Sequence, residues 1–542
     1  AIGMLCIPAL TIRAAKSTIN ATKMISPPPD PLTLTPPPSP GIIRIHEFRL
    51  PMGESSVLSI QHIGEMEMEA QRAFCEENKR LLRARYGRPP KALVRAFGCA
   101  QNMDDGEKIK GMLAEMGCQF TDSVEEADIA LYNTCAIREN AEQKVFGILG
   151  QATHQKESRR EMLIALCGCM AQQKEVSDKL KQSFPGVDLV FGPHALYKLP
   201  QLLHETILHA VPGRRRRVYD TEEIDGVIAE GIPTLREDKV RAGLPIMYGC
   251  NNFCTYCVVP LVRGRERSRR PEDVLREAKE LIAAGYKEIT LLGQNVNSYG
   301  KNGEEGMDFP ELLEAVANLP GDFWVRFMTS HPRDCTRKLI DTMARNPKIC
   351  KSLHLPVQSG STRVLQAMNR HYTREQYLDI VRYAKEKIPG LHLTSDIIVG
   401  FPGETREEFE ETLSLIREVG YQSLFTFIFS PRPGTKAARM DDPVPAAEKS
   451  RWFQELLAVQ KECGMRFYDG MEGQTVKVLC EGYGKEKGIL SGEPVPAGQS
   501  LLMGRTEEGM VVDFFGADSL IGQFVPVTIT RSQNFALAGR AE

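Results

Sequence analysis

The chain has 542 residues, a formal net charge of -2, 42% hydrophobic residues and 25% charged residues, a composition ordinary for a soluble globular protein. Its length predicts about three domains. Because the net charge is small, any RNA-binding surface must be local. The mean hydropathy is -0.27 and no apolar run reaches about 18 residues, so a membrane-spanning helix is not expected.

Residues 1–88 are predicted to be an extension of the folded part. Residues 1–41 hold the runs Pro27–Pro29 and Pro36–Pro38 and no acidic residue before Asp30, which is typical of disorder. The first 24 residues of the chain are faintly similar to an organelle transit peptide. The preferred interpretation is an extension without a targeting role. Residues 62–86 are predicted to form a charged helix.

Residues 90–207 are predicted to form an α/β domain with a parallel sheet. Four apolar runs are strand candidates, at 92–97, 127–132, 161–166 and 187–191. Each is followed by a helical stretch, at 104–116, 137–157, 171–183 and 194–208. Strand–helix alternation predicts right-handed βαβ units. The basic run Arg214–Arg217 is predicted to be a linker.

A second alternating series predicts a partial (β/α)6 barrel over residues 236–468. Its strand candidates are 244–249, 287–292, 323–329, 351–355, 391–399 and 421–428. Six units are fewer than the eight of a complete barrel. Residues 470–535 carry short β-type runs among glycines, which predicts a small β-barrel.

Three cysteines follow the first strand candidate of the barrel in the pattern C-x3-C-x2-C. They are Cys250, Cys254 and Cys257, hereafter the barrel trio. Zinc is the obvious rival, but a structural zinc site usually has four ligands in two separated pairs. Three thiolates suit a four-iron cluster that leaves one iron open for a small molecule. The active sites of such barrels lie at the carboxyl ends of the strands, which is where these cysteines are expected.

Three more cysteines follow three successive strand candidates of the first domain. They are Cys99, Cys135 and Cys169, hereafter the sheet trio. Because the carboxyl ends of parallel strands meet at one edge, the three thiolates can converge there. The alternative is that they are core residues, as scattered cysteines usually are. Cys167 is interpreted as a buried thiol, with a ligand role as the alternative.

The C-x3-C-x2-C spacing resembles that of the radical S-adenosylmethionine superfamily. The segments FGCAQN, NTCAIR and GCMAQ around the sheet trio resemble the amino-terminal domain of the methylthiotransferases. That family joins this domain to a radical S-adenosylmethionine barrel and a carboxyl-terminal TRAM barrel, in the order predicted for residues 90–535. The branch acting on N6-dimethylallyladenosine of tRNA is the most similar, through stretches that include VRGRERSR (262–269), HLPVQSGS (354–361), MNRHYT (368–373) and DIIVGFPGET (396–405).

The resemblance implies two 4Fe-4S clusters and S-adenosylmethionine as cofactors. The barrel trio would hold the cluster that generates a 5′-deoxyadenosyl radical, and the sheet trio would hold an auxiliary cluster that carries or donates sulfur. The implied reaction replaces the C2–H of N6-dimethylallyladenosine, beside the anticodon, with a methylthio group. Two molecules of S-adenosylmethionine are used, because one methylates the sulfur and another supplies the radical.

Five further residues are expected to contact the cofactor. The resemblance places Tyr256 beside the adenine and Gly400 and Gly403 near the adenosine, where glycine lets the backbone approach a ligand. Gln358 follows a strand end and is expected to line the pocket. Arg263 lies in the basic run after the barrel trio and is expected to hold RNA phosphates or the carboxylate of S-adenosylmethionine. Ordinary packing and a solvated charge are the alternatives.

The resemblance also implies partners. They are the anticodon loop of tRNA, whose unpaired bases can enter a pocket, an electron donor such as flavodoxin or ferredoxin, and a sulfur source that the sequence does not reveal. A cytoplasmic monomer is expected. The rival functions are a sister methylthiotransferase acting on threonylcarbamoyladenosine of tRNA or on an aspartate of a ribosomal protein, and a non-catalytic iron–sulfur RNA-binding protein.

Overall fold

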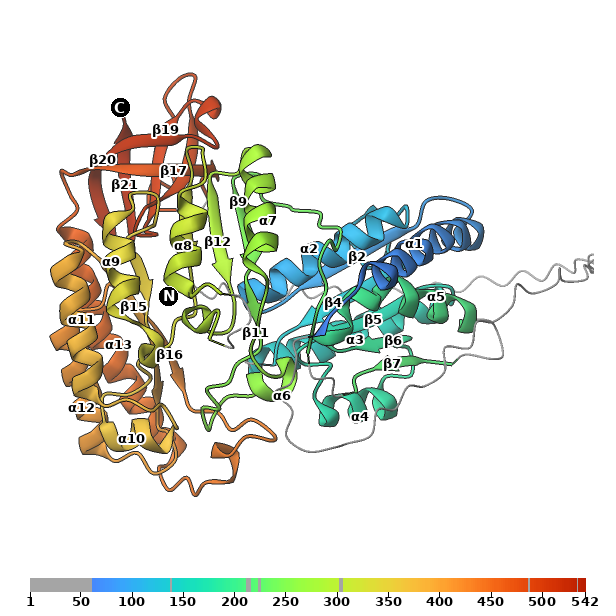
Figure 1. Ribbon diagram of the computed structural model, residues 1–542, viewed down its shortest axis with the longest axis horizontal. Helices are drawn as coiled ribbons and strands as arrows, with labels where there is room; N and C mark the ends of the chain where they lie inside the picture. The colour runs from blue at the N-terminus through green and yellow to red at the C-terminus, as the bar shows by residue number, and fades with distance from the viewer. Residues whose placement is uncertain are drawn as a thin grey trace, which may run out of the picture. The chain divides into compact units, whose positions relative to one another are not determined.

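The computed structural model describes residues 61–136, 139–210, 216–222, 226–301, 306–485, 488–533 and 535–542. The disorder predicted for residues 1–41 lies outside these ranges, as do Arg214 and Arg215 of the predicted linker. The chain from Ile60 onward forms one compact unit. Its elements follow the predicted order of a sheet domain, a partial barrel and a small β-barrel (Figure 1).

The amino-terminal domain contains a six-stranded parallel sheet in the order β3-β2-β4-β5-β6-β7. Its strands are β2 (Lys91–Ala96), β3 (Gln119–Phe120), β4 (Ile129–Thr134), β5 (Leu163–Gly168), β6 (Leu189–Phe191) and β7 (Val218–Asp220). The central strands β4 and β5 are buried along their whole length. The sequence did not predict β3 and β7, because runs of two or three residues carry no readable period.

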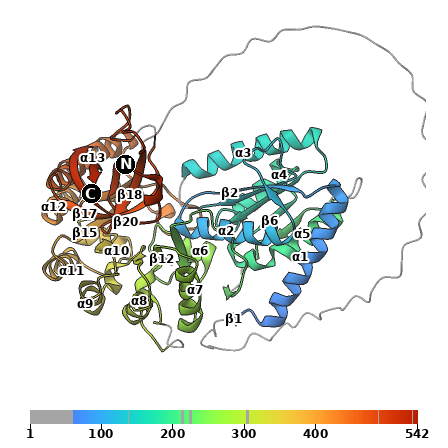
Figure 2. The ribbon, with the colours of Figure 1, turned by 90° about the horizontal axis from the view of Figure 1, so that it is seen from above.

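Helices cover both faces of this sheet (Figure 2). One face packs against α1, α2 and α5, and the other against α3 and α4. Their bounds are α1 (Glu65–Tyr86), α2 (Ala100–Glu115), α3 (Glu139–Ser158), α4 (Lys174–Ser183) and α5 (Leu199–His209), with the 3-10 helix η1 (Pro193–Lys198) before α5. The predicted charged helix is therefore present as α1. Two covered faces explain why the central strands read as continuous apolar runs.

The barrel of the central domain is built from two parallel three-stranded sheets, β13-β12-β9 and β14-β15-β16. The strands are β9 (Arg241–Pro245), β12 (Glu288–Leu292), β13 (Trp324–Phe327), β14 (Ser352–His354), β15 (His392–Val399) and β16 (Ser423–Ile428). The larger helices are α7 (Pro271–Ala283), α8 (Phe309–Ala317), α9 (Arg337–Arg345), α11 (Arg374–Lys387), α12 (Arg406–Val419) and α13 (Ala446–Asp469). This is the predicted partial (β/α)6 barrel, and its core lies between strands and helices.

Strand β15 shows how the barrel acquires an accessible inner wall. Leu393, Ile397 and Val399 alternate along it and are buried in the core shared with the helices. Because side chains of a strand alternate between two faces, Thr394 and Asp396 point the other way, and they are only partly buried. The inner face therefore keeps polar side chains in reach of a ligand.

The carboxyl-terminal domain is a closed barrel in the strand order β17-β18-β19-β21-β20, seen at one end of the barrel in Figure 1. Its strands are β17 (Thr475–Tyr483), β18 (Ser500–Thr506), β19 (Val511–Gly516), β20 (Phe524–Gln533) and β21 (Ala536–Ala541). Phe524 packs against Trp324 of the larger barrel with ring centroids 4.6 Å apart. This contact anchors the small domain at the end of the strands opposite to the cysteine loop.

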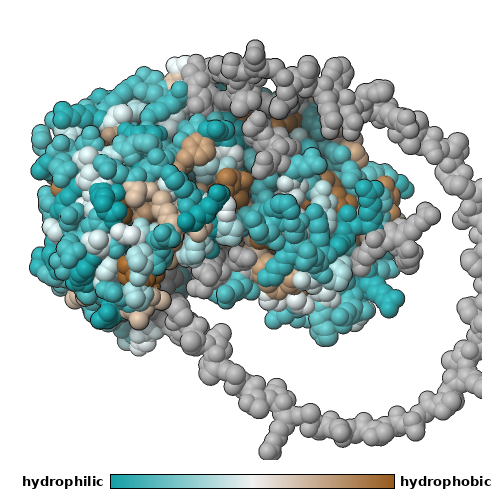
Figure 3. All heavy atoms as spheres, turned by 90° about the horizontal axis from the view of Figure 1, so that it is seen from below, coloured by the Kyte–Doolittle hydropathy of each residue, from teal (hydrophilic) through white to brown (hydrophobic). Residues whose placement is uncertain are grey.

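In the described residues, no helix has the length and apolarity that crossing a bilayer requires. The face of the molecule in Figure 3 is mostly hydrophilic, with separate small hydrophobic patches. The large apolar side chains are instead gathered in the cores of the three domains.

Trp452 provides a test of the barrel core. Its ring stacks on Phe409 at 5.2 Å and 8°, which fastens α13 to α12. We expect Trp452→Ala to lower the free energy of unfolding by about 3–5 kcal/mol, because it leaves a cavity in a close-packed core. Urea unfolding measures the change. The control is Tyr483→Ala, an aromatic side chain in a residue that is 61% exposed, which should cost less than about 0.5 kcal/mol. Equal losses would contradict the prediction.

Candidate functional site

The sheet trio lies at the carboxyl edge of the amino-terminal sheet. Cys135 and Cys169 directly follow β4 and β5, and Cys99 caps α2. The thiols of Cys99 and Cys169 both point at Asn102 Oδ1, at 4.0 and 3.8 Å. A hydrogen bond from Cys135 lowers the pKa of Cys99 to about 6. The three sulfur atoms therefore gather around the first turn of α2.

Gly98 permits this approach of two loops. Its φ is 110°, and a Cβ atom there would overlap the side chain of Cys135. Only glycine meets both conditions without strain. The backbone conformation and the close approach of Cys135 therefore require glycine at the position before Cys99.

The barrel trio lies on the loop between β10 (Met247–Tyr248) and α6 (Val259–Arg263). The N–H of Cys250 donates to the carbonyl of Gly264 at 3.1 Å, and that of Cys257 to the carbonyl of Cys254 at 3.0 Å. Burial, with a smaller contribution from Cys254, raises the pKa of Cys250 and of Cys257 to about 12. These thiols keep their protons until a cation displaces them.

Backbone strain gathers around the barrel trio. Six described residues other than glycine have positive φ. Five of them lie on loops of the central barrel: Phe253, Thr329, Gln358, Asn369 and His371. Phe253 lies inside the cysteine loop, and Asn369 Nδ2 donates to its carbonyl at 3.0 Å. Strain of this kind persists only where the surroundings enforce it, and it clusters at functional sites.

The residues predicted to line the cofactor pocket lie next to this loop. Tyr256 packs against an apolar group formed by Val364, Met368, Phe401 and Ala437. Gln358 is buried, and its backbone N–H donates to the carbonyl of Asp396 at 2.9 Å, on β15. Packing thus fixes Tyr256 and a backbone hydrogen bond fixes Gln358, and the contact of either residue with a cofactor stays a prediction.

Gly400 and Gly403 begin the loop that follows β15. Both have positive φ, 70° and 76°, so a side chain at either position would be strained. The carboxylate of Glu404 accepts the N–H of Gly400 at 2.6 Å and that of Phe401 at 3.2 Å. This buried carboxylate holds the loop in its tight turn.

Arg263 has a different place from the one expected. It donates from Nε to Cys169 Sγ at 3.1 Å and from Nη2 to Asn102 Oδ1 at 2.8 Å and Asp105 Oδ2 at 2.6 Å. The expected contacts were RNA phosphates or S-adenosylmethionine. Instead, the buried guanidinium reaches from the end of α6, the helix that follows the loop of the barrel trio, to Cys169 of the sheet trio. These three partners lie 94 or more residues away in sequence, so the sequence around Arg263 could not predict them.

Sequence reasoning also missed Arg370. Its Nη1 donates to Cys254 Sγ at 3.3 Å, and the residue is buried. Arg370 lies in the stretch MNRHYT, whose resemblance to the family was the one available signal. The contact spans 116 residues, so only the tertiary structure shows it.

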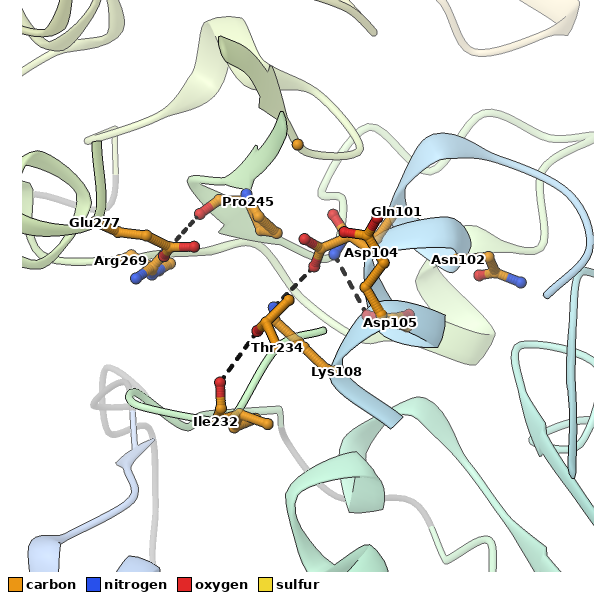
Figure 4. Close-up of polar contacts among 12 residues, drawn as sticks. Gln101, Asn102, Asp104, Asp105, Lys108, Ile232, Thr234, Pro245, Arg269 and Glu277 are labelled. Carbon is orange, nitrogen blue, oxygen red and sulfur yellow. Dashed lines mark hydrogen bonds and ion pairs between the residues drawn. The ribbon is translucent and has the colours of Figure 1, made fainter. Parts of the chain in front are cut away.

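Buried charges join α2 to the barrel (Figure 4). Lys108 pairs with Asp104 at 2.8 Å on α2. Arg236 reaches both Glu107 of α2, at 3.2 Å, and Glu277 of α7, at 3.0 Å. The ion pairs of Arg236 are partly buried and connect α2 to α7, so they help to hold the helix that carries Asn102 against the barrel.

Three thiols in each trio are a donor set that suits an iron–sulfur cluster. Within the described residues, no three His, Cys, Asp or Glu side chains are close enough to share one metal ion. A cluster needs less convergence, because each thiolate binds a different iron. The cysteines of the described residues are all free of disulfides. Cys167 lies on β5 with its side chain in the core, and its pKa is raised well above the usual value by desolvation.

Comparison with known proteins defines the class first. Residues 244–416 match the Radical SAM superfamily, residues 91–192 match Uncharacterized protein family UPF0004, and residues 470–541 match the TRAM domain. A radical S-adenosylmethionine methyltransferase from Kitasatospora setae, TsrM, is similar at a TM-score of 0.47 and 14% identity, over 64% of this chain and 74% of that chain.

The relatives are more specific. The chain is 47% identical over 446 residues to a tRNA-2-methylthio-N(6)-dimethylallyladenosine synthase of Clostridium botulinum, covering 82% of this chain and 94% of the relative. A protein of the same name from Acetivibrio thermocellus is 45% identical over 481 residues, covering 88% of this chain and 97% of the relative. The chain belongs to the family of tRNA-2-methylthio-N(6)-dimethylallyladenosine synthases.

Glu404 predicts a pH effect on stability. Burial raises its pKa to about 7, with Glu408 adding to the rise and Lys449 opposing it. A carboxyl whose pKa is higher in the folded state costs nothing below its unfolded pKa of about 4.3. Above that pH the unfolded state loses the proton first, so stability falls until the pH passes about 7 and the full cost is present.

We expect Glu404→Gln to remove this cost. The variant should match the parent near pH 4.5 and exceed its free energy of unfolding near pH 8 by an amount on the order of 3 kcal/mol. Urea unfolding across this pH range measures the difference. The control is Glu462→Gln, whose side chain is 53% exposed and should show no such pH-dependent gain. A variant that is no more stable than the parent at pH 8 would refute the prediction.

Proposed function

We propose that this protein converts N6-dimethylallyladenosine in tRNA, next to the anticodon, to its 2-methylthio derivative. One observation carries the proposal: two cysteine trios lie on loops of adjoining domains and are linked by Arg263, which contacts Cys169 at 3.1 Å. A reaction that inserts sulfur at an unactivated carbon needs a radical source and a sulfur carrier. Relatives of 45–47% identity that bear this activity in their names support the assignment.

The chain's own residues supply the setting for two 4Fe-4S clusters. The barrel trio would hold one and the sheet trio the other, and three ligands leave one iron of each open. Bound S-adenosylmethionine supplies a 5′-deoxyadenosyl radical, which removes a hydrogen that no side-chain base can take. Tyr256, Gln358, Gly400 and Gly403 would line the S-adenosylmethionine site and keep water from it.

The polar inner wall of β15 would receive the substrate base. An anticodon loop presents unpaired bases that can be turned out of their stack into a pocket. The predicted domains are residues 90–207, 236–468 and 470–535. The last of them, the TRAM domain, would provide part of the RNA contacts. An electron donor such as flavodoxin or ferredoxin would reduce the barrel cluster, and the protein would act as a cytoplasmic monomer.

Nucleoside mass spectrometry of tRNA tests the function. A strain that lacks the gene should lose 2-methylthio-N6-dimethylallyladenosine and accumulate N6-dimethylallyladenosine, and the gene should restore the product. If threonylcarbamoyladenosine loses its methylthio group instead, the protein has the sister activity on tRNA. If the methylthio groups of tRNA are intact and a ribosomal-protein aspartate lacks its own, the protein modifies the ribosomal protein. A reduced protein that forms no 5′-deoxyadenosine from S-adenosylmethionine would favour a non-catalytic RNA-binding role.

A further inference from the structure

Each cysteine trio receives a hydrogen bond from one buried arginine. Arg263 Nε lies 3.1 Å from Cys169 Sγ of the sheet trio, and Arg370 Nη1 lies 3.3 Å from Cys254 Sγ of the barrel trio. Both arginines are 4% exposed. The positive charges are therefore poorly screened by water, and each acts at short range on one sulfur.

The two arginines differ in their other partners. Arg263 pairs with Asp105 at 2.6 Å, and the side chains of the two residues are 5% and 6% exposed. Arg370 donates instead to neutral groups, the hydroxyl of Tyr372 at 2.9 Å and the carbonyl of Pro356 at 2.7 Å. Among the described residues no carboxylate lies within 4.0 Å of Arg370. A carboxylate thus offsets the charge of one guanidinium and not that of the other.

We propose that this difference separates the reduction potentials of the two clusters. The uncompensated charge of Arg370 raises the potential of the barrel cluster, while Asp105 cancels most of the effect of Arg263 on the sheet cluster. The physical reason is that reduction adds negative charge, which a neighbouring cation stabilises, and that hydrogen bonds to the sulfurs and net charge set such potentials. The inference rests on the proposed function, since it requires a cluster on each trio.

Other charges near the trios do not remove the contrast. Glu266 acts electrostatically on Cys250, whereas Arg370 contacts the sulfur of Cys254, so this carboxyl does not pair with the guanidinium. Lys108 is already paired with Asp104. With both clusters bound, the charge of Arg370 would favour electron uptake at the barrel trio over uptake at the sheet trio.

Two substitutions test the proposal with shifts of opposite sign, and the first of them is nearly isosteric. Asp105→Asn uncovers the charge of Arg263 and should raise the midpoint potential of the sheet cluster, leaving the barrel cluster unchanged. Arg370→Gln keeps a donor but removes the charge, and should lower the midpoint potential of the barrel cluster alone. We expect each shift to change the reduction equilibrium at least tenfold, which is ~59 mV for one electron. Redox titration of the anaerobic full-length protein, followed by electron paramagnetic resonance, measures both.

Controls separate charge from folding. The signal that S-adenosylmethionine perturbs identifies the barrel cluster, and iron content shows whether both clusters are present. Arg370→Lys keeps the charge and should keep the potential, which a merely structural role would not predict. Should Arg370→Gln lose iron, Asp105→Asn and Arg370→Lys still decide the matter. Full iron content with unchanged potentials, or shifts of the same sign in both variants, would overturn the proposal. A parent protein with only one cluster would instead refute the proposed function.

Discussion

Cys254→Ala is expected to abolish the formation of 5′-deoxyadenosine from S-adenosylmethionine. Cys254 is the middle cysteine of the barrel trio, and the arginine that donates to its sulfur is buried. Loss of an outer-shell partner already costs about 10–100-fold in activity or metal affinity, so loss of a ligand should cost at least ~100-fold. Iron should fall from about eight to about four atoms per chain, because the sheet trio keeps its cluster.

Liquid chromatography of the nucleoside products and iron analysis measure the two effects. The matched control is Cys335→Ala, a buried cysteine of the same domain that belongs to neither trio. It should keep full iron and full 5′-deoxyadenosine formation, with a loss of stability only. Survival of 5′-deoxyadenosine formation in Cys254→Ala at parent levels would remove the radical assignment.

Cys135→Ala should separate sulfur insertion from radical formation. Cys135 lies at the end of β4 and is in hydrogen-bond contact with Cys99, so its loss should release the cluster of the sheet trio. The backbone bonds that hold the barrel trio do not involve this loop. The variant should therefore still form 5′-deoxyadenosine, while the methylthio product falls at least ~100-fold.

The control for this experiment is Cys167→Ala. Cys167 is only two positions from Cys169, but it lies on β5 with its side chain in the core. It should retain iron and product, and loss of iron there would make Cys167 the ligand instead. Mass spectrometry of tRNA incubated with each protein measures the product. Methylthio product at parent levels in Cys135→Ala would exclude the sheet trio from sulfur transfer.

Some boundaries in the barrel could not be predicted from local pattern. The first strand candidate was 244–249, but β9 covers Arg241–Pro245. Pro245 has no N–H to donate to a neighbouring strand. Its carbonyl accepts a hydrogen bond from the side chain of Arg269, Nη1, at 2.6 Å. The pattern of apolar residues does not reveal that the strand ends at Pro245. The strand is set by pairing with β12, which begins 47 residues further on.

The sequence by itself determined the domain order and the positions of both trios. Strand–helix alternation imposes parallel sheets, and parallel sheets bring their carboxyl ends to one edge. The cysteines that follow β4 and β5, and the one that begins α2, therefore had to lie at that edge. The tight spacing of Cys250, Cys254 and Cys257 likewise places them on one loop, whatever the rest of the chain does.

Only the tertiary structure decided what surrounds the sulfur atoms. Arg263 follows the barrel trio in sequence, yet it donates to Cys169 of the sheet trio, and Arg370 reaches Cys254 from a distant loop. The charge that offsets Arg263 lies on α2, in Asp105. Periodicity and spacing describe neighbours along the chain, whereas the partner of a buried charge is chosen by which surfaces pack together and exclude water. That choice exists only once the domains are folded.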